Sequence, residues 1–327
     1  LIALALLILS ADYAVKKAVG VAAFLKLSST FMGVTVISVA TSIPEITAHL
    51  TASIGILTGS LDYKIGSSIV LGANIGSDVI QQTFILGLVV LLTGGLKFRK
   101  YFLWKTMIPM IITTIMCVVL GVDGVYSRID GLILFGSFVG YMYYMYIDER
   151  KHYREEDNQV KDEKIANGIP KNRKEAIRDS LLAVAALGIT VVSANYVLQI
   201  TEVIVGRTGI GGSLIGVVTL GVASAMPELI TALAGIRNKE TGISLGALIG
   251  SNITNPLLAI GGGALVSTYY VPRPLVLWDL PWETLTGVIL WIVLWFSNGK
   301  LKKWAAVYLM VLYFVYLFTR ATFFAID

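Results

Sequence analysis

The stretch that decides the fold is GVTVISVATSIPE, residues 33–45, which recurs in altered form as GVVTLGVASAMPE at 216–228. A second pair of related stretches, GANIGSDVIQ at 72–81 and GALIGSNITN at 246–255, follows in the same order. Two matched blocks in one order are not expected by chance. The pattern indicates that the chain consists of two related halves.

The composition places most of the chain in lipid. Of the 327 residues, 56% are hydrophobic and only 14% are charged, which lies outside the range of soluble domains. One membrane span needs about 20 mostly apolar residues. Ten such stretches are found, at 1–25, 29–57, 65–94, 103–121, 129–147, 180–203, 213–236, 241–268, 277–297 and 304–324. The sequence therefore predicts an all-α integral membrane protein with ten transmembrane helices.

The only long polar segment divides the ten expected helices into two groups of five. It covers residues 148–178 and carries both signs of charge, so we interpret it as a linker between repeats at 1–147 and 179–327. Because five is an odd number, the second repeat enters the membrane from the opposite side. Inverted repeats of this kind are typical of secondary transporters, whose substrate sites lie at the repeat interface near the bilayer midplane.

The net charge of +5 is a signal of orientation rather than of a nucleic-acid partner. If the expected spans alternate, most basic residues fall on one side, the side of the linker, and this side is the cytoplasm by the positive-inside rule. We expect a multi-pass protein of the cell membrane with both termini extracellular. The single cysteine and two histidines exclude a conventional transition-metal cluster, and no cofactor is expected.

Two glutamates occupy equivalent positions in the repeats, and both lie at membrane depth. Glu45 follows Pro44 and Glu228 follows Pro227. A proline inside a helix removes one backbone hydrogen bond and leaves a carbonyl to find another partner. Hydroxyl side chains stand beside each glutamate, at Thr41, Ser42 and Ser224. Charged groups at this depth are costly and usually functional, although a proline-kinked packing helix with a neutral glutamate is the alternative.

The second motif supplies polar groups on a facing helix. Ser77 and Gln81 are four residues apart, as are Ser251 and Asn255, so each pair lies on one helical face. The glycines of these motifs have the spacing that lets helices approach closely. Together with the two glutamates, these side chains form an all-oxygen set suited to a hard cation such as Ca²⁺, which takes about 6–8 oxygens.

These motifs resemble the two α-repeats of the Ca²⁺/cation antiporter superfamily, and in particular the prokaryotic sodium/calcium exchangers. The resemblance implies ion sites between the second, third, seventh and eighth helices, with the first and sixth helices sliding to give alternating access. By position it implies ligating side chains at Glu45, Glu228, Thr41, Ser42, Ser77, Ser224 and Ser251. It also implies that the backbone carbonyls of Ser38 and Gly221 contribute.

The sequence departs from the sodium-exchanger pattern at the ion site. Ala225 takes the place of a hydroxyl, Gln81 replaces the usual asparagine, and Asn255 stands where an archaeal exchanger has aspartate. These changes weaken the case for sodium, so exchange of Ca²⁺ for H⁺ is favoured and exchange for Na⁺ is the alternative. A cation channel and an exchanger of another divalent cation are more remote. An intramembrane enzyme is not indicated, because the sequence places no Ser–His or Cys–His pair at membrane depth.

Three further polar residues lie close to these motifs. Asp78 is expected to face a neighbouring helix or a water-filled passage, and Asp12, matched by Asn195, to bond locally within its own repeat. His49 lies one turn after Glu45 and is expected at a pore mouth or interface. Apart from residues near span ends, the only acidic residues expected at depth are Asp12, Glu45, Asp78 and Glu228.

Overall fold

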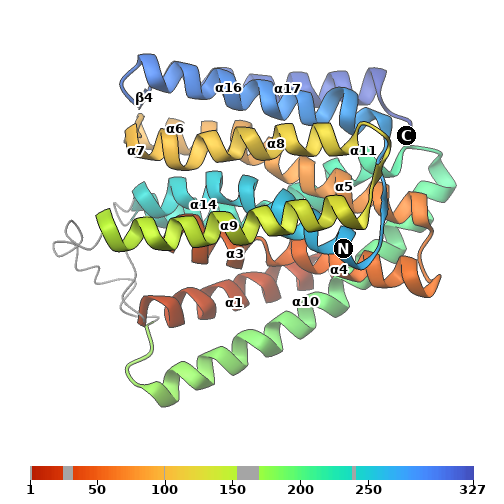
Figure 1. Ribbon diagram of the computed structural model, residues 1–327, viewed down its shortest axis with the longest axis horizontal. Coiled ribbons are helices and arrows are strands. Elements are labelled where there is room, and N and C mark those ends of the chain that lie inside the picture. The colour runs from red at the N-terminus through yellow and green to blue at the C-terminus, as the bar shows by residue number, and fades with distance from the viewer. Residues whose placement is uncertain (1, 25–31, 99, 153–168, 238–240) are drawn as a thin grey trace.

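The computed structural model describes residues 2–24, 32–98, 100–152, 169–237 and 241–327, and these are almost entirely helical. In the first half the elements are α1 (Ile2–Phe24), η1 (Met32–Ile37), α3 (Ser38–Thr41), α4 (Ile43–Thr58), α5 (Tyr63–Ile80), η2 (Gln81–Ile85), α6 (Leu86–Thr93), β1 (Leu96–Lys97), α7 (Lys100–Phe102), η3 (Leu103–Met107), α8 (Ile108–Gly121), β2 (Val125–Tyr126) and α9 (Arg128–His152). Elements labelled η are π-helical turns. Most of the helices run roughly along one direction (Figure 1).

The second half repeats this order of elements. It contains α10 (Arg173–Thr208), α11 (Gly212–Gly216), η6 (Val217–Gly221), α12 (Val222–Ser224), α13 (Met226–Arg237), α14 (Thr241–Thr254), η7 (Asn255–Ile260), α15 (Gly261–Val266), β3 (Tyr269–Tyr270), η8 (Leu275–Asp279), α16 (Leu280–Phe296), β4 (Lys300–Leu301) and α17 (Lys303–Phe323). Each stretch that the sequence predicts as a span contains helical segments among its described residues. Within the described ranges, five helical stretches are long and apolar enough to cross a membrane: Tyr63–Thr93, Leu103–Gly121, Gly212–Leu233, Leu275–Phe296 and Lys303–Phe323.

Contacts between the halves occur in matched pairs. Helix α5 packs against α11 and η6, and its counterpart α14 packs against η1 and α3. The short strands also pair between the halves, since β1 pairs antiparallel with β4 and β2 pairs antiparallel with β3. Each contact thus has an equivalent in which the two halves change places, and the central interface contains the helices that carry the repeated motifs.

Glycines allow the central helices to cross at backbone distance. A Cβ atom on Gly72 would lie 2.1 Å from the carbonyl oxygen of Ser213, and one on Gly76 would lie 2.7 Å from the Cα of Val217. Such distances are below normal contact. In the matching crossing, a Cβ on Gly250 would meet the carbonyl oxygen of Val34 at 2.9 Å. These glycines confirm the close helix approach that their spacing predicts.

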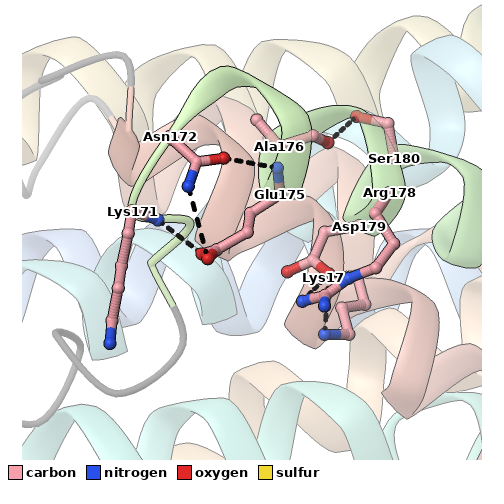
Figure 2. A network of polar contacts seen from close by, with 8 residues as sticks. All are labelled: Lys17, Lys171, Asn172, Glu175, Ala176, Arg178, Asp179 and Ser180. Carbon is pink, nitrogen blue, oxygen red and sulfur yellow. Dashed lines mark hydrogen bonds and ion pairs between the residues drawn. The ribbon is translucent and has the colours of Figure 1, made fainter.

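Helices α1 and α10 lie side by side at one edge of the bundle (Figure 1). At mid-length, the hydroxyls of Ser10 and Thr190 are 2.9 Å apart. Near the linker end, Lys17 Nζ donates to Asp179 Oδ1 at 3.1 Å, and the Arg178 guanidinium donates to the same carboxylate at 3.3 Å (Figure 2). The Lys17 ammonium holds the pKa of the Asp179 carboxyl below its ordinary value through this hydrogen bond.

The predicted linker is described only at its two ends. Helix α9 continues to His152 and α10 begins at Arg173, so both helices extend into the range 148–178. Asn172 caps α10 by accepting a hydrogen bond from the Glu175 amide at 2.9 Å (Figure 2). Residues 153–168 lie outside the described part of the chain.

Candidate functional site

Each of the two repeat-equivalent glutamates lies in the first turn of a helix that follows a break. Helix α3 ends at Thr41 and α4 begins at Ile43, which places Glu45 in the first turn of α4. In the second half, α13 begins at Met226 and places Glu228 in its first turn. The break arises because Pro44 and Pro227 cannot continue the preceding helix. The start of a helix carries partial positive charge, which favours a carboxylate there.

The carbonyls expected to face an ion already accept hydrogen bonds in this conformation. Ser38 O accepts from the backbone amide of Ser42 at 3.0 Å and from the Thr41 hydroxyl at 3.3 Å. Gly221 O accepts from the amide of Ala225 at 3.2 Å and from the Ser224 hydroxyl at 3.3 Å. Each of the two carbonyls therefore accepts the same pair of hydrogen bonds, one from a backbone amide and one from a hydroxyl. An ion would have to displace or share the hydroxyl contacts.

All predicted ion ligands are enclosed by protein, and they come together from the two halves. The most exposed of them, Ser224, retains 5% of its surface and Glu45 retains 2%. The buried set comprises Glu45, Glu228, Ser38, Thr41, Ser42, Ser77, Ser224, Ser251, Gln81, Asn255 and Gly221. No described basic side chain forms an ion pair with either glutamate, so two acids lie in an apolar medium without a protein counter-charge.

A chain of hydrogen bonds connects Glu45 to the second half. Ser77 Oγ donates to Glu45 Oε1 at 2.8 Å, and Gln81 Nε2 donates to Ser77 Oγ at 2.9 Å. The hydroxyl of Ser251 in turn donates to Gln81 Oε1. The polar side chains predicted to share helical faces are thus joined across the interface of α5 and α14.

Glu228 has fewer partners than Glu45. Neither of its carboxylate oxygens accepts a hydrogen bond from a described donor, and the side chain is fully buried. Thr41 lies near Glu228 and Ser224 lies near Glu45, each without a well-formed hydrogen bond. The two glutamates are close enough for their charges to interact. Unpaired buried carboxylate oxygens are costly, so this pair is suited to hold a cation or protons.

A small cavity of about 10 Å³ lies beside Glu45. Its lining includes Asn74, His49 and Ser224 as well as Pro44, so it borders both halves. This volume is close to the minimum that holds one water-sized particle. The site therefore has space for a small species next to the glutamate but not for a large substrate.

The structure places His49 inside the bundle rather than at its surface. Its ring Nδ1 is 3.2 Å from the Tyr269 hydroxyl, which also donates to the His49 carbonyl at 2.9 Å. The Ser53 hydroxyl contacts the same Tyr269 oxygen at 2.6 Å. His49 is therefore an interface residue between α4 and β3, one of the two locations predicted for it. The side chains of Asp12 and Asn195 lie outside the described residues.

Two further acidic residues, outside the four expected at depth, are buried in the protein. Asp279 and Glu283 near the start of α16 are buried to 0% and 1% exposure. Asp279 accepts from Arg320 Nε at 2.8 Å and from the Tyr316 hydroxyl at 2.6 Å. They were missed because they fall close to the end of a predicted span, where acids normally reach water. The only available signal was the presence of two acids four residues apart within that span.

A profile of the sodium/calcium exchanger protein family matches residues 1–147 and 180–322, which is most of the chain. The chain belongs to the sodium/calcium exchanger protein family. This exchanger protein also resembles the inner membrane protein YrbG of Escherichia coli, with 27% identity over 82% of this chain and 78% of YrbG.

Other relatives extend over nearly the whole exchanger protein. The sodium/calcium exchanger MaX1 of Methanosarcina acetivorans is 24% identical over 97% of this chain and 96% of its own. The solved structure of the sodium-calcium exchanger NCX_Mj aligns with a TM-score of 0.64 and 23% identity, covering 98% of this chain and 96% of that one. The H⁺/Ca²⁺ exchanger CAX aligns with a TM-score of 0.77 and 16% identity, covering 95% and 79%. The two structures establish the shared fold.

Proposed function

We propose that this exchanger protein is a secondary active antiporter that moves Ca²⁺ in exchange for H⁺, with Glu45 and Glu228 as the central ligands. The observation that carries this proposal is the pair itself. Two repeat-equivalent carboxylates lie in the first turns of helices that follow a break, are buried, and interact through their charges, and no described residue forms an ion pair with them. Binding one Ca²⁺ would cancel their combined charge in a medium where charge is costly.

The matched contacts between the halves support an inverted repeat of ten transmembrane helices. An element pair such as α5 with η6 recurs as α14 with η1, as expected when two halves related by a two-fold axis in the membrane plane enclose one site. Alternating access then requires the rest of the protein to open this interface to each side in turn. The orientation with extracellular termini and a cytoplasmic linker belongs to the same proposal.

The counter-ion is inferred from charge balance and from the side chains at the site. Two carboxylates are neutral with either one Ca²⁺ or two protons, whereas three Na⁺ would leave one excess positive charge. Gln81 and Asn255 add no charge, and the buried Ala225 offers no hydroxyl. These features favour protons. Na⁺ is the second candidate because the relative MaX1 is a sodium/calcium exchanger.

Transport into proteoliposomes would test the proposal. With radioactive Ca²⁺ inside or outside the vesicles, an imposed pH gradient should drive uptake, and a change in membrane potential should leave the rate unchanged. Glu45→Gln and Glu228→Gln should each abolish exchange, because one carboxylate would leave the Ca²⁺ charge half compensated. Glu175→Gln, at the exposed start of α10, makes the same chemical change away from the site and serves as the control.

Two results would count against the proposal in different ways. Uptake that requires Na⁺, responds to potential and ignores pH would replace the proton by sodium but retain the glutamate pair. Exchange at the normal rate by either glutamine variant, in correctly inserted protein, would exclude the two-glutamate site. Downhill Ca²⁺ flux without any opposing ion would indicate a channel instead of an antiporter.

A further inference from the structure

A second group of buried polar side chains extends from α5 and α14 through η2 to α16. Asn252 Nδ2 donates to the backbone carbonyl of Asp78 at 3.0 Å and faces Gln82 Oε1 at 3.5 Å. Gln82 Nε2 donates to the Glu283 carbonyl at 2.9 Å and to the Thr286 hydroxyl at 2.6 Å. These five residues form a continuous polar group that includes two acids from different helices.

The acids of this group are not satisfied by the protein. Both carboxylate oxygens of Glu283, the Oδ2 of Asp78 and the Oδ1 of Asn252 are buried and accept no hydrogen bond from a described donor. Asp78 and Asn252 are 0% exposed and Glu283 is 1% exposed. The charge of Asp78 interacts with Glu283 and, more weakly, with Glu45 and Glu228 of the exchange site. Four unpartnered oxygens at one buried junction are costly unless something binds them.

The described buried arginine does not supply the missing charge. Arg320 directs its Nε to Asp279, one turn before Glu283, and its Nη2 to the Ser213 hydroxyl. Asp279 therefore has a partner of opposite charge and Glu283 does not. Among the described ion pairs, none includes Asp78 or Glu283.

The repeat does not require an acidic side chain at position 78. In the aligned motifs Asp78 corresponds to Asn252, so the second half has an amide where the first has an acid. The amide in the second half shows that packing at this position is compatible with a neutral side chain. Asp78 Oδ1 accepts from Asn255 Nδ2 at 2.6 Å, which leaves Oδ2 for another partner.

We propose that Asp78 and Glu283 form a second cation site, which takes a small hard metal cation and lies next to the predicted exchange site, whose Asn255 donates to Asp78. The described chain contains no group of three or more acids, histidines or cysteines arranged for a metal, so amide and hydroxyl oxygens complete this site. The additional donors are Asn252 Oδ1, Gln82 Oε1 and Thr286 Oγ1. Oxygen donors of this kind suit Ca²⁺ and Na⁺ rather than softer metals. This inference goes beyond the exchange site and does not require that Glu45 and Glu228 transport Ca²⁺.

Equilibrium dialysis of the purified full chain in lipid nanodiscs would test the proposal, with radioactive Ca²⁺ and Na⁺ in separate arms. The Glu45→Gln/Glu228→Gln protein removes the carboxylates of the exchange site, and it should still bind about one cation per chain in at least one arm. Adding Glu283→Gln should remove this binding. In the wild-type background, Glu283→Gln alone should lower the number of bound cations by about one, whereas Glu175→Gln should not.

Thermal unfolding provides a second measurement on the same proteins, because a cation that binds only the folded state raises the midpoint. The cation should raise the midpoint of the double variant, and Glu283→Gln should abolish the rise. The proposal is overturned if the folded double variant binds neither cation, or if its binding is unchanged by Glu283→Gln. If the double variant does not fold, an unchanged cation count on Glu283→Gln in the wild-type background overturns it.

Discussion

Replacing Gly216 by alanine should separate the two helices at the centre of the molecule. A Cβ on Gly216 would lie 2.3 Å from the carbonyl oxygen of Ile69 and 2.8 Å from the amide nitrogen of Ala73. Ordinary contact begins at about 3.4 Å, so the Ile69 oxygen would have to move by about 1.1 Å, the difference between 3.4 and 2.3. Both neighbours are backbone atoms, and no side-chain rotation can relieve the clash.

Overpacking of a tight interior costs about 1–3 kcal/mol, and a clash with backbone belongs at the upper end of that range. A loss of about 3 kcal/mol lowers the ratio of folded to unfolded protein about a hundredfold. The thermal midpoint in detergent should therefore fall by about 5 °C. Ca²⁺ exchange should fall as well, because α5 carries Ser77 and the segment after Gly216 leads to Glu228.

The control is Gly136→Ala in α9, where a Cβ would meet nothing within 4 Å. This substitution removes the flexibility of a helical glycine and should raise the midpoint slightly, by the equivalent of about 0.5–1 kcal/mol. Midpoints can be measured by size-exclusion chromatography after heating. If Gly216→Ala is as stable as Gly136→Ala, the α5–η6 contact is looser than the structure indicates and the reasoning is wrong.

Three other predictions concern residues outside the exchange site. Arg320→Met should lower the thermal midpoint through a loss of about 3–5 kcal/mol in stability, because Asp279 would remain buried without its partner. The double variant Asp279→Asn/Arg320→Met should regain stability. No recovery in the double variant would contradict this account. The Lys17–Asp179 contact should stabilise the protein at neutral pH. It should be lost as the pH falls below the ordinary aspartate pKa of about 4 and through the lower folded-state value. Asp179→Asn should therefore reduce the midpoint at pH 7 and have no effect at sufficiently acid pH. Shortening the segment 153–168 while keeping enough residues to join α9 and α10 should leave Ca²⁺ uptake unchanged, and lost uptake in an inserted protein would reveal a regulatory role.

The repeated motifs were sufficient to predict the central part of the fold. The proline before each glutamate predicted a break, and the structure shows one between Thr41 and Ile43. The four-residue spacing of Ser77 and Gln81 predicted a shared face, and the two side chains are hydrogen-bonded. These predictions succeed because helical geometry and the missing proline N–H are local properties of the sequence. Whether the predicted ligands bind an ion stays a prediction.

Features that depend on packing between distant segments could not be predicted in this way. Glu283 lies near a predicted span end, yet its carbonyl accepts from Gln82 of η2, and α16 packs against α8 and α5, which are remote in sequence. The π-helical turns that begin at Gln81 and Asn255 have no simple sequence signal, although such turns are frequent at functional sites. The two strand pairs join short segments far apart in the chain, so alternation within each segment gave no indication of them.

The hydrogen bonds that join Ser251 to Glu45 all point in one direction. Ser251 donates to Gln81, Gln81 donates to Ser77, and Ser77 donates to Glu45. The sequence of bonds therefore has a polarity, and it ends on a carboxylate that can only accept while it is ionised. If Glu45 acquires a proton, it can donate to Ser77, which reverses that bond, but Gln81 can reverse its own two contacts only by turning its amide through half a rotation. Protonation of Glu45 in the first half would thus change the orientation of the Gln81 amide. This change would alter the hydrogen bond to Ser251 in the second half without any movement of the backbone.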